Sequence, residues 1–333
     1  MAYKYNLAVG FINLAIAERQ VTRKMERSLS AIRLLEDLVI LDPYRIEYQN
    51  SLALVLRNVY GFMANSGQVP EARPYLQRAS DLYRHIAKVQ DDKFPMMLCR
   101  TLSTMADLDV RLGNHAHSKE LLDETRDILL KYVVADPQSN SKARELMVNY
   151  KTTGLLQDDM CDPTNSIENF RSALKIAMGA SDKPRSSLEQ THLAVLMSWL
   201  GRVLLRSGDT DEAEAILKQS HTIIQAIPED ERREACWGTL GRILYYANEW
   251  QKAKEAFEKG FAQSPDSNPS TINENCWYFA MTLARLGERD RATELFDKLA
   301  AELNSLYNGH DYRGFRSEAQ AAIEAAATGF PNR

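Results

Sequence analysis

Arginine and aromatic residues recur at one spacing in the second half of the chain. Arg202 and Arg206 are four residues apart, as are Arg242 and Tyr246, and Arg285 stands at the equivalent place further on. Residues four apart share one face of a helix. A guanidinium group binds a carboxylate or a phosphate through two parallel hydrogen bonds, and an aromatic ring offers flat surface beside it. The spacing therefore predicts a strip that binds an acidic or phosphorylated peptide.

Small residues border this strip. Gly201, Gly241 and Ala280 directly precede the three spaced groups, at places where two helices must approach closely. The full set of candidate peptide-binding residues is Ser198, Arg202, Arg206, Gly238, Arg242, Tyr246, Trp277 and Arg285. Arginines that serve a ligand should be weakly paired within the protein, so charge reversal of Arg202 and Arg242 should leave the fold intact. The alternative is that these arginines pair with acidic residues on neighbouring helices and bind no ligand.

The element that positions these residues is a pair of helices joined by a short turn, most complete in residues 234–267. Its apolar positions follow the helical period, first in Trp237, Leu240, Gly241 and Leu244, then in Ala253, Phe257 and Phe261, with Pro265 as the stop. This stretch resembles the tetratricopeptide repeat, a helix–turn–helix unit of about 34 residues. It departs from that pattern at Leu244, where tyrosine is usual, and at Gly260, where alanine is usual.

Further pairs are expected along the chain, because a lone helix pair cannot bury its apolar face. We expect units at about 3–43, 46–91, 95–137, 141–181, 186–228, 234–267 and 270–307. Residues 310–333 should form a capping helix, Tyr312–Thr328, and a short tail. The predicted fold is all-α: an α-solenoid of about seven helix pairs with a C-terminal capping helix, for which the resemblance implies a right-handed superhelix. An irregular helical bundle is the alternative.

Helix lengths and starts can be predicted in part. The positions equivalent to Gly241 are 15, 60, 106, 154, 201, 241 and 280, and each interval exceeds the usual repeat length. The second helices are therefore expected to be longer than in the standard unit. Capping boxes are predicted at Asn165 with Glu168, Asp209 with Glu212, and Asn248 with Gln251.

Composition excludes several classes of protein. A chain of 333 residues with a formal charge of −4 lacks the concentrated basic surface that nucleic-acid binding needs. The four cysteines are far apart, which favours a reduced, cytoplasmic setting. The uncharged runs 5–17 and 190–201 are too short to insert across a membrane. A signal peptide ending near Ala17 is an alternative, but the helical pattern continues through that point. Met1 opens almost directly onto a helix, as expected of a piece of a longer protein.

Other polar clusters have simpler interpretations. His115 and His117 could supply half of a metal site, but no cysteine or carboxylate pattern in the sequence completes it. A solvated turn is expected there, and Asp158-Asp159 and residues 229–231 are expected to be solvated helix ends. We expect Cys236 and Cys276 to be buried or half-buried thiols on helical faces. No nucleophile stands at a recognisable spacing from a base, so no catalytic residue, metal or cofactor is predicted.

A second resemblance concerns the wider protein. Residues 41–43 (Leu-Asp-Pro), 47–48 (Glu-Tyr) and 52–53 (Leu-Ala), with 279–287 and 313–319, are similar to the C-terminal arrays of planctomycete-type bacterial serine/threonine kinases. The kinase's own catalytic motifs are missing from this sequence. The resemblance implies a non-catalytic protein–protein interaction scaffold, the docking or sensor region of a bacterial signalling protein. The alternative is a ligand- or peptide-responsive regulatory array attached to a protease or DNA-binding effector. An enzyme in its own right is disfavoured.

Overall fold

The computed structural model describes residues 1–18, 20–64, 66, 68–89, 94–136, 139–179, 185–263, 274–307 and 309–328. These residues form fifteen α-helices and two short 3-10 helices, with no strand among them. The chain divides into two compact units, Met1–Leu108 with Glu120–Tyr132, and Asp109–Lys119 with Val133–Arg333. The predicted all-α fold is therefore confirmed.

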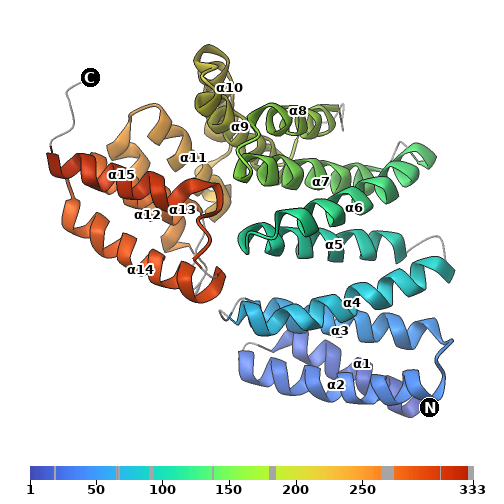
Figure 1. Ribbon diagram of the computed structural model, residues 1–333. Helices are drawn as coiled ribbons and strands as arrows, with labels where there is room; N and C mark the ends of the chain where they lie inside the picture. Colours follow the sequence, from blue (N-terminus) through green and yellow to red (C-terminus); the bar gives the residue numbers. More distant parts are fainter. Residues whose placement is uncertain are drawn as a thin grey trace. The chain divides into compact units, whose positions relative to one another are not determined.

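The helices follow one another in pairs (Figure 1). The first three pairs are α1 (Ala2–Ala17) with α2 (Val21–Leu41), α3 (Ile46–Ala64) with α4 (Val69–Val89), and α5 (Phe94–Arg111) with α6 (His115–Ala135). The next four are α7 (Asn140–Asp159) with α8 (Pro163–Gly179), α9 (Ser187–Ser207) with α10 (Thr210–Gln225), α11 (Glu234–Tyr246) with α12 (Trp250–Ala262), and α13 (Glu274–Arg285) with α14 (Arg289–Tyr307). The 3-10 helices are η1 (Glu229–Glu231) and η2 (Tyr312–Gly314), and α15 (Phe315–Thr328) closes the series.

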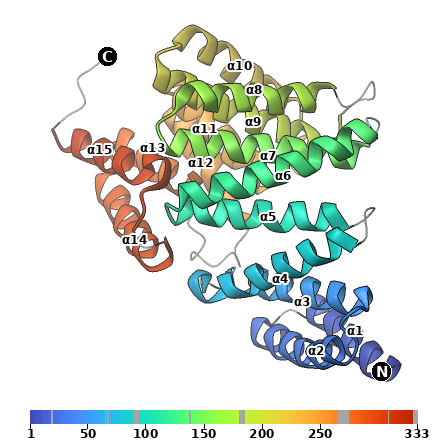
Figure 2. The same cartoon turned by 45° about the vertical axis from the view of Figure 1, so that its right-hand side comes forward.

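This succession of seven pairs and a closing helix is the predicted α-solenoid architecture. In the first unit, the apolar faces of α1 to α4 share one core that includes Leu35, Tyr48 and Leu56. In the second unit, α15 packs against both helices of the seventh pair, α13 and α14, and the three lie together in Figures 1 and 2. The side chains of Phe315 and Ala319 are buried in that contact.

The glycines that mark the first helices α7, α9 and α11 lie against a large residue of the second helix, as predicted. An added Cβ at Gly201 would approach the side chain of Leu217 to 2.7 Å, and one at Gly241 would approach the ring of Phe257 to 2.5 Å. Both distances are shorter than any real carbon contact, so only glycine lets the paired helices come this close. The glycines of the repeat pattern are thus required for the close packing of the paired helices.

The longer spacing of the first repeats is explained by their second helices. Helices α2, α4 and α6 have 21 residues each, whereas α12 has 13. The predicted helix stop at Pro265 lies outside the described residues. None of the helices in the described ranges combines the length and apolar character that a membrane span requires.

Two predicted helix starts are wrong. Asn248 does not cap α12: its φ of 59° is in the left-handed region, and the residue at the cap is Glu249, whose side chain makes no capping hydrogen bond. Asn165 lies inside α8, which begins at Pro163. Asp162 precedes it, and its carboxylate accepts hydrogen bonds from the backbone and side chain of Asn165. Proline is preorganised for the first helical position, which moves the start upstream of the predicted cap.

The third predicted cap is placed correctly but lacks its hydrogen bond. Asp209 is the N-cap of α10, yet its carboxylate accepts from the hydroxyl of Ser207. A complete capping box that the sequence reading missed begins α9, where the hydroxyl of Ser186 accepts from the backbone of Glu189 and the Glu189 carboxylate accepts from the backbone of Ser186. This box fixes the start of the helix that carries Arg202.

Candidate functional site

The eight predicted binding residues come from the first helices α9, α11 and α13 of the second unit, and we call them the arginine face. Their exposure divides them into two groups. Ser198, Arg202, Gly238, Arg242 and Trp277 are buried. Arg206 is exposed, and Tyr246 and Arg285 are half-buried.

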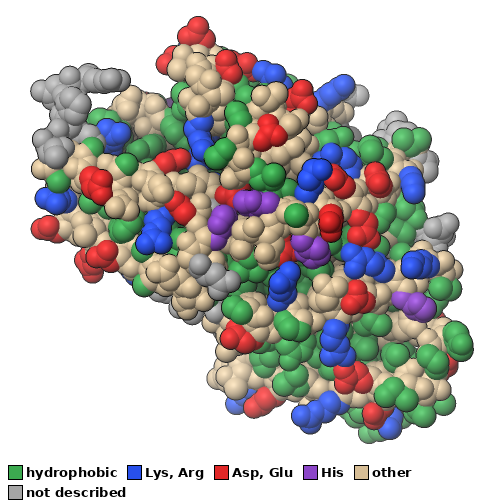
Figure 3. Space-filling model, viewed as in Figure 1, with side chains coloured by type: hydrophobic (Ala, Val, Ile, Leu, Met, Phe, Trp, Pro, Cys, Tyr) green, Lys and Arg blue, Asp and Glu red, His purple; other side chains and the backbone are tan. Residues whose placement is uncertain are grey.

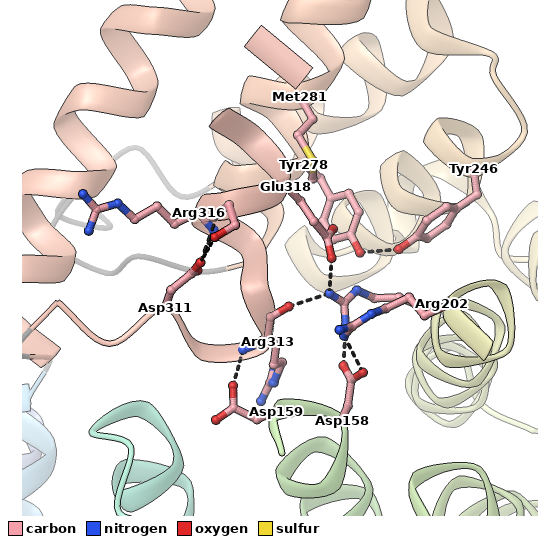
Figure 4. A network of polar contacts seen from close by, with 12 residues as sticks. Asp158, Asp159, Arg202, Tyr246, Tyr278, Met281, Asp311, Arg313, Arg316 and Glu318 are labelled. Atoms are coloured by element: carbon pink, nitrogen blue, oxygen red, sulfur yellow. Dashed lines mark hydrogen bonds and ion pairs between the residues drawn. The ribbon is translucent and has the colours of Figure 1, made fainter. Parts of the chain in front are cut away.

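Arg202 is the centre of a buried polar network (Figure 4). Its guanidinium forms an ion pair with Asp158, donates to the carbonyl oxygen of Arg313 at 2.7 Å, and forms a second ion pair with Glu318 at 2.7 Å. The guanidinium carbon lies 4.7 Å from the centre of the Phe315 ring. Only 2% of the Arg202 side chain is exposed. The C-terminal segment 310–328 therefore contacts the arginine face directly.

Asp158 is the acidic counterpart of two arginines. Its second oxygen forms an ion pair with Arg206 at 2.7 Å. Asp158 and Asp159 are 4% and 2% exposed, so the prediction of a solvated helix end is wrong. The last turn of α7 presents both carboxylates to charged and polar partners, and a buried carboxylate is retained only where such partners compensate its lost hydration.

Arg242 is also engaged within the protein. It donates to Asn275 at 2.6 Å and to the hydroxyl of Ser198 at 3.2 Å, and its guanidinium lies 4.9 Å from the ring centre of Trp199. A side chain at Gly238 would overlap that of Asn275, so this glycine makes room for the contact. The expectation of weak internal pairing does not hold for Arg202 or Arg242.

Glu274 interacts electrostatically with two arginines of this network, Arg242 and Arg313. Desolvation opposes the ionisation of Glu274, but the guanidiniums of Arg313 and Arg242 outweigh it, and the pKa of Glu274 lies below its usual value. Glu274 is therefore ionised at neutral pH, at the start of α13.

The aromatic members have packing partners. Tyr246 and Tyr278 share a hydrogen bond between their hydroxyls, and burial raises the pKa of Tyr278 to about 12. Both phenols are thus neutral at physiological pH. The ring of Trp277 packs edge-on against Phe296 at 5.9 Å, and the Arg285 guanidinium lies 5.8 Å from the ring centre of Trp250.

The two histidines of the 115–117 segment also have acidic partners, and they lie in the first turn of helix α6, so the prediction of a turn is wrong. The Nε2 atom of His115 lies 2.5 Å from a carboxylate oxygen of Asp159, and His117 Nδ1 lies 2.6 Å from Asp109. His310, just before η2, also reaches Asp159. The sequence did not predict this cluster because His115, Asp159 and His310 are far apart along the chain.

The family comparison agrees with the geometry of these helix pairs. The profile described as tetratricopeptide repeat matches residues 192–265, which cover α9 to α12 with their packed glycines. The match to the tetratricopeptide-repeat profile is confined to these residues. Proteins built from tetratricopeptide repeats generally mediate protein–protein interaction. No curated protein sequence matches this chain.

Several solved structures are similar to this chain. BtubC (BKLC) from P. vanneervenii superimposes with a TM-score of 0.51 and 15% identity, covering 77% of this chain and 95% of that one. A tetratricopeptide repeat protein from Parabacteroides merdae gives 0.48 and 14%, covering 96% and 99%. A Rap protein complexed with competence and sporulation factor gives 0.45 and 17%, covering 98% of each chain. At these identities the likeness to BtubC concerns the fold alone.

Proposed function

We propose that this chain is a non-catalytic interaction scaffold whose arginine face binds an extended acidic segment of a partner protein. One observation carries the proposal: Arg202 holds a carboxylate, that of Glu318, and a backbone carbonyl, that of Arg313, from the same C-terminal segment. These are the two kinds of group that an acidic peptide offers. The segment 310–328 thus acts as an internal occupant of a surface suited to such a ligand.

The proposal has a consequence for how a partner binds. Arg206, Tyr246 and Arg285 remain partly accessible at the edge of the arginine face, whereas Arg202 is covered. A partner first contacts the accessible residues and then competes with Glu318 for Arg202. The internal segment is tethered, so its effective concentration is high, on the order of millimolar for a short linker. Loosening the segment should therefore strengthen partner binding.

A peptide array tests this function. Acidic and phosphorylated peptides should be retained more strongly than basic ones, and retention should fall as salt rises, because salt screens exposed charges. Glu318→Gln should increase retention, since it removes the internal competitor for Arg202. Replacing both Arg206 and Arg285 by glutamate should reduce retention on the order of 10-fold or more, as loss of charge complementarity does at other interfaces.

The matched control is Arg171→Glu, which changes an exposed arginine paired with Glu212 on a different surface. It should leave retention unchanged. Equal retention of acidic and basic peptides, or full retention by the Arg206 and Arg285 double variant, would place the binding surface elsewhere.

We further propose that the scaffold works in the cytoplasm as the docking or sensor region of a bacterial signalling protein. The proposal rests on the resemblance of residues 41–43, 47–48, 52–53, 279–287 and 313–319 to the C-terminal arrays of planctomycete-type kinases. A kinase domain encoded directly upstream of this chain would support that role. A protease or DNA-binding domain in its place would contradict it.

A further inference from the structure

Three side chains with metal-binding atoms meet at the end of α7. Asp159 is the last residue of that helix, His115 is the first residue of α6, and His310 lies between α14 and η2. The Nε2 atoms of His115 and His310 lie 2.5 and 3.1 Å from the same oxygen of Asp159. One ligand atom from each residue lies within 4.8 Å of the others. On the face shown in Figure 3, histidine side chains gather beside acidic ones.

The carboxylate of Asp159 directs one oxygen, Oδ2, at the two imidazoles. Its other oxygen, Oδ1, accepts the backbone N–H of Arg313. The neighbouring arginines Arg202 and Arg206 are committed to Asp158. The Asp159 side chain is 2% exposed, and a buried carboxylate needs partners that neutralise its charge. The imidazoles of His115 and His310 and the backbone amide of Arg313 orient it, and the two imidazoles are the partners of its Oδ2 atom among the described residues.

The surrounding backbone keeps space for His310. Gly309 and Gly113 both have positive φ values, 73° and 75°. A Cβ at Gly113 would lie 3.1 Å from His310 Nδ1, tighter than an ordinary contact. Glycine at this turn therefore allows the imidazole to reach Asp159. The two histidine side chains are 27% and 28% exposed, so an ion can reach the nitrogens from solvent.

We propose that His115, Asp159 and His310 bind a Zn²⁺ ion. Two imidazole nitrogens and one carboxylate oxygen are a known donor set for zinc, with water as the fourth ligand. Zinc–ligand bonds of about 2.0–2.2 Å place tetrahedral donors on the order of 3.3 Å apart, so the donor atoms must shift by about 1 Å from their present separations. Binding requires neutral imidazoles that present the Nε2 lone pair, and the ion then replaces the hydrogen bonds to Asp159.

The proposed ion joins segments that are distant in the sequence. His310 is three residues before Arg313, whose carbonyl contacts Arg202. A metal bond at His310 would therefore hold the beginning of the C-terminal segment against the end of α7. The site does not depend on the proposed function: an ion can bind here whether or not the arginine face binds a partner.

Calorimetric titration of the full chain with ZnCl₂ tests the site. The protein should carry no histidine tag and should be treated with a chelator beforehand. We expect one Zn²⁺ per chain, a higher melting temperature with zinc, and no comparable effect of Mg²⁺, which prefers oxygen ligands. His310→Gln and His115→Gln should each weaken Zn²⁺ binding on the order of 100-fold or more, because each removes one of three protein ligands.

His117→Gln is the matched control, since this histidine is two residues from His115 but contacts Asp109. It should bind zinc as the unaltered chain does. If the ligand variants fail to fold, the visible spectrum of the unaltered chain with Co²⁺ decides: intense four-coordinate bands support the site. Absence of saturable zinc binding, or equal binding by His310→Gln and the unaltered chain, would show a hydrogen-bonded cluster only and overturn the proposal.

Discussion

Replacing Phe315 by alanine should lower the free energy of unfolding by about 3–5 kcal/mol, the usual range for a fully buried phenylalanine. The ring is 1% exposed and lies 5.7 Å from Tyr278 and 6.1 Å from Trp199, beneath the guanidinium of Arg202. Its removal leaves a cavity between α15 and α13 and loosens the residues that hold Arg202. Chemical denaturation followed by circular dichroism measures the loss.

Tyr44→Ala is the control for this variant, because Tyr44 is an aromatic residue with 90% exposure. It should change the free energy of unfolding by less than about 0.5 kcal/mol. If the two variants are equally stable, α15 is a loosely attached tail and the internal-occupant account of segment 310–328 is wrong.

Replacing Arg202 by glutamine should cost about 3 kcal/mol, at the lower end of the range for breaking a buried ion pair. The lower end applies because Arg206 still faces Asp158 after the change. The variant also deprives the Arg313 carbonyl of its donor. A double-mutant cycle with Asp158→Asn should give a coupling energy of about 1–3 kcal/mol, since the two side chains are in direct contact.

Arg171→Gln provides the comparison, because its ion pair with Glu212 is about half exposed. Exposed pairs contribute roughly 0–1 kcal/mol, so this variant should be nearly as stable as the unaltered chain. A stable Arg202→Gln variant with no coupling to Asp158 would contradict the structural role of the network. That result would agree with the prediction from the sequence that these arginines are weakly paired within the protein.

The repeat architecture was predictable because its signals are local. A helix pair brings residues sixteen apart into contact, as Gly241 and Phe257 show, and the same small and large types recur along the chain. The order of pairs and the closing helix follow from that recurrence. Turn geometry was less predictable: at Asn248 and Asn165 several polar residues compete for the cap, and the sequence pattern does not decide between them.

The partners of the arginine face could not be predicted. Arg202 meets Asp158, Arg313 and Glu318, which are 44, 111 and 116 residues away. Such contacts depend on how α7 and α15 pack against α9, which no local pattern encodes. One signal was available in retrospect: Asp158 and Asp159 stand four and five residues after Gly154, close to the place that Arg206 holds after Gly201. Asp158 is the one that pairs with Arg202 and Arg206, so acidic residues near the arginine position of the preceding repeat indicated pairing between repeats.

Hydrogen exchange of residues 315–328 tests the central claim most directly, namely that a partner displaces the C-terminal segment from the arginine face. The exchange of α15 should be measured in the full chain, alone and saturated with the most strongly retained acidic peptide. We expect slow exchange in the free chain, faster exchange of α15 on peptide binding, and continued protection of α9 and α11. A bound peptide that leaves the exchange of α15 unchanged would contradict the account.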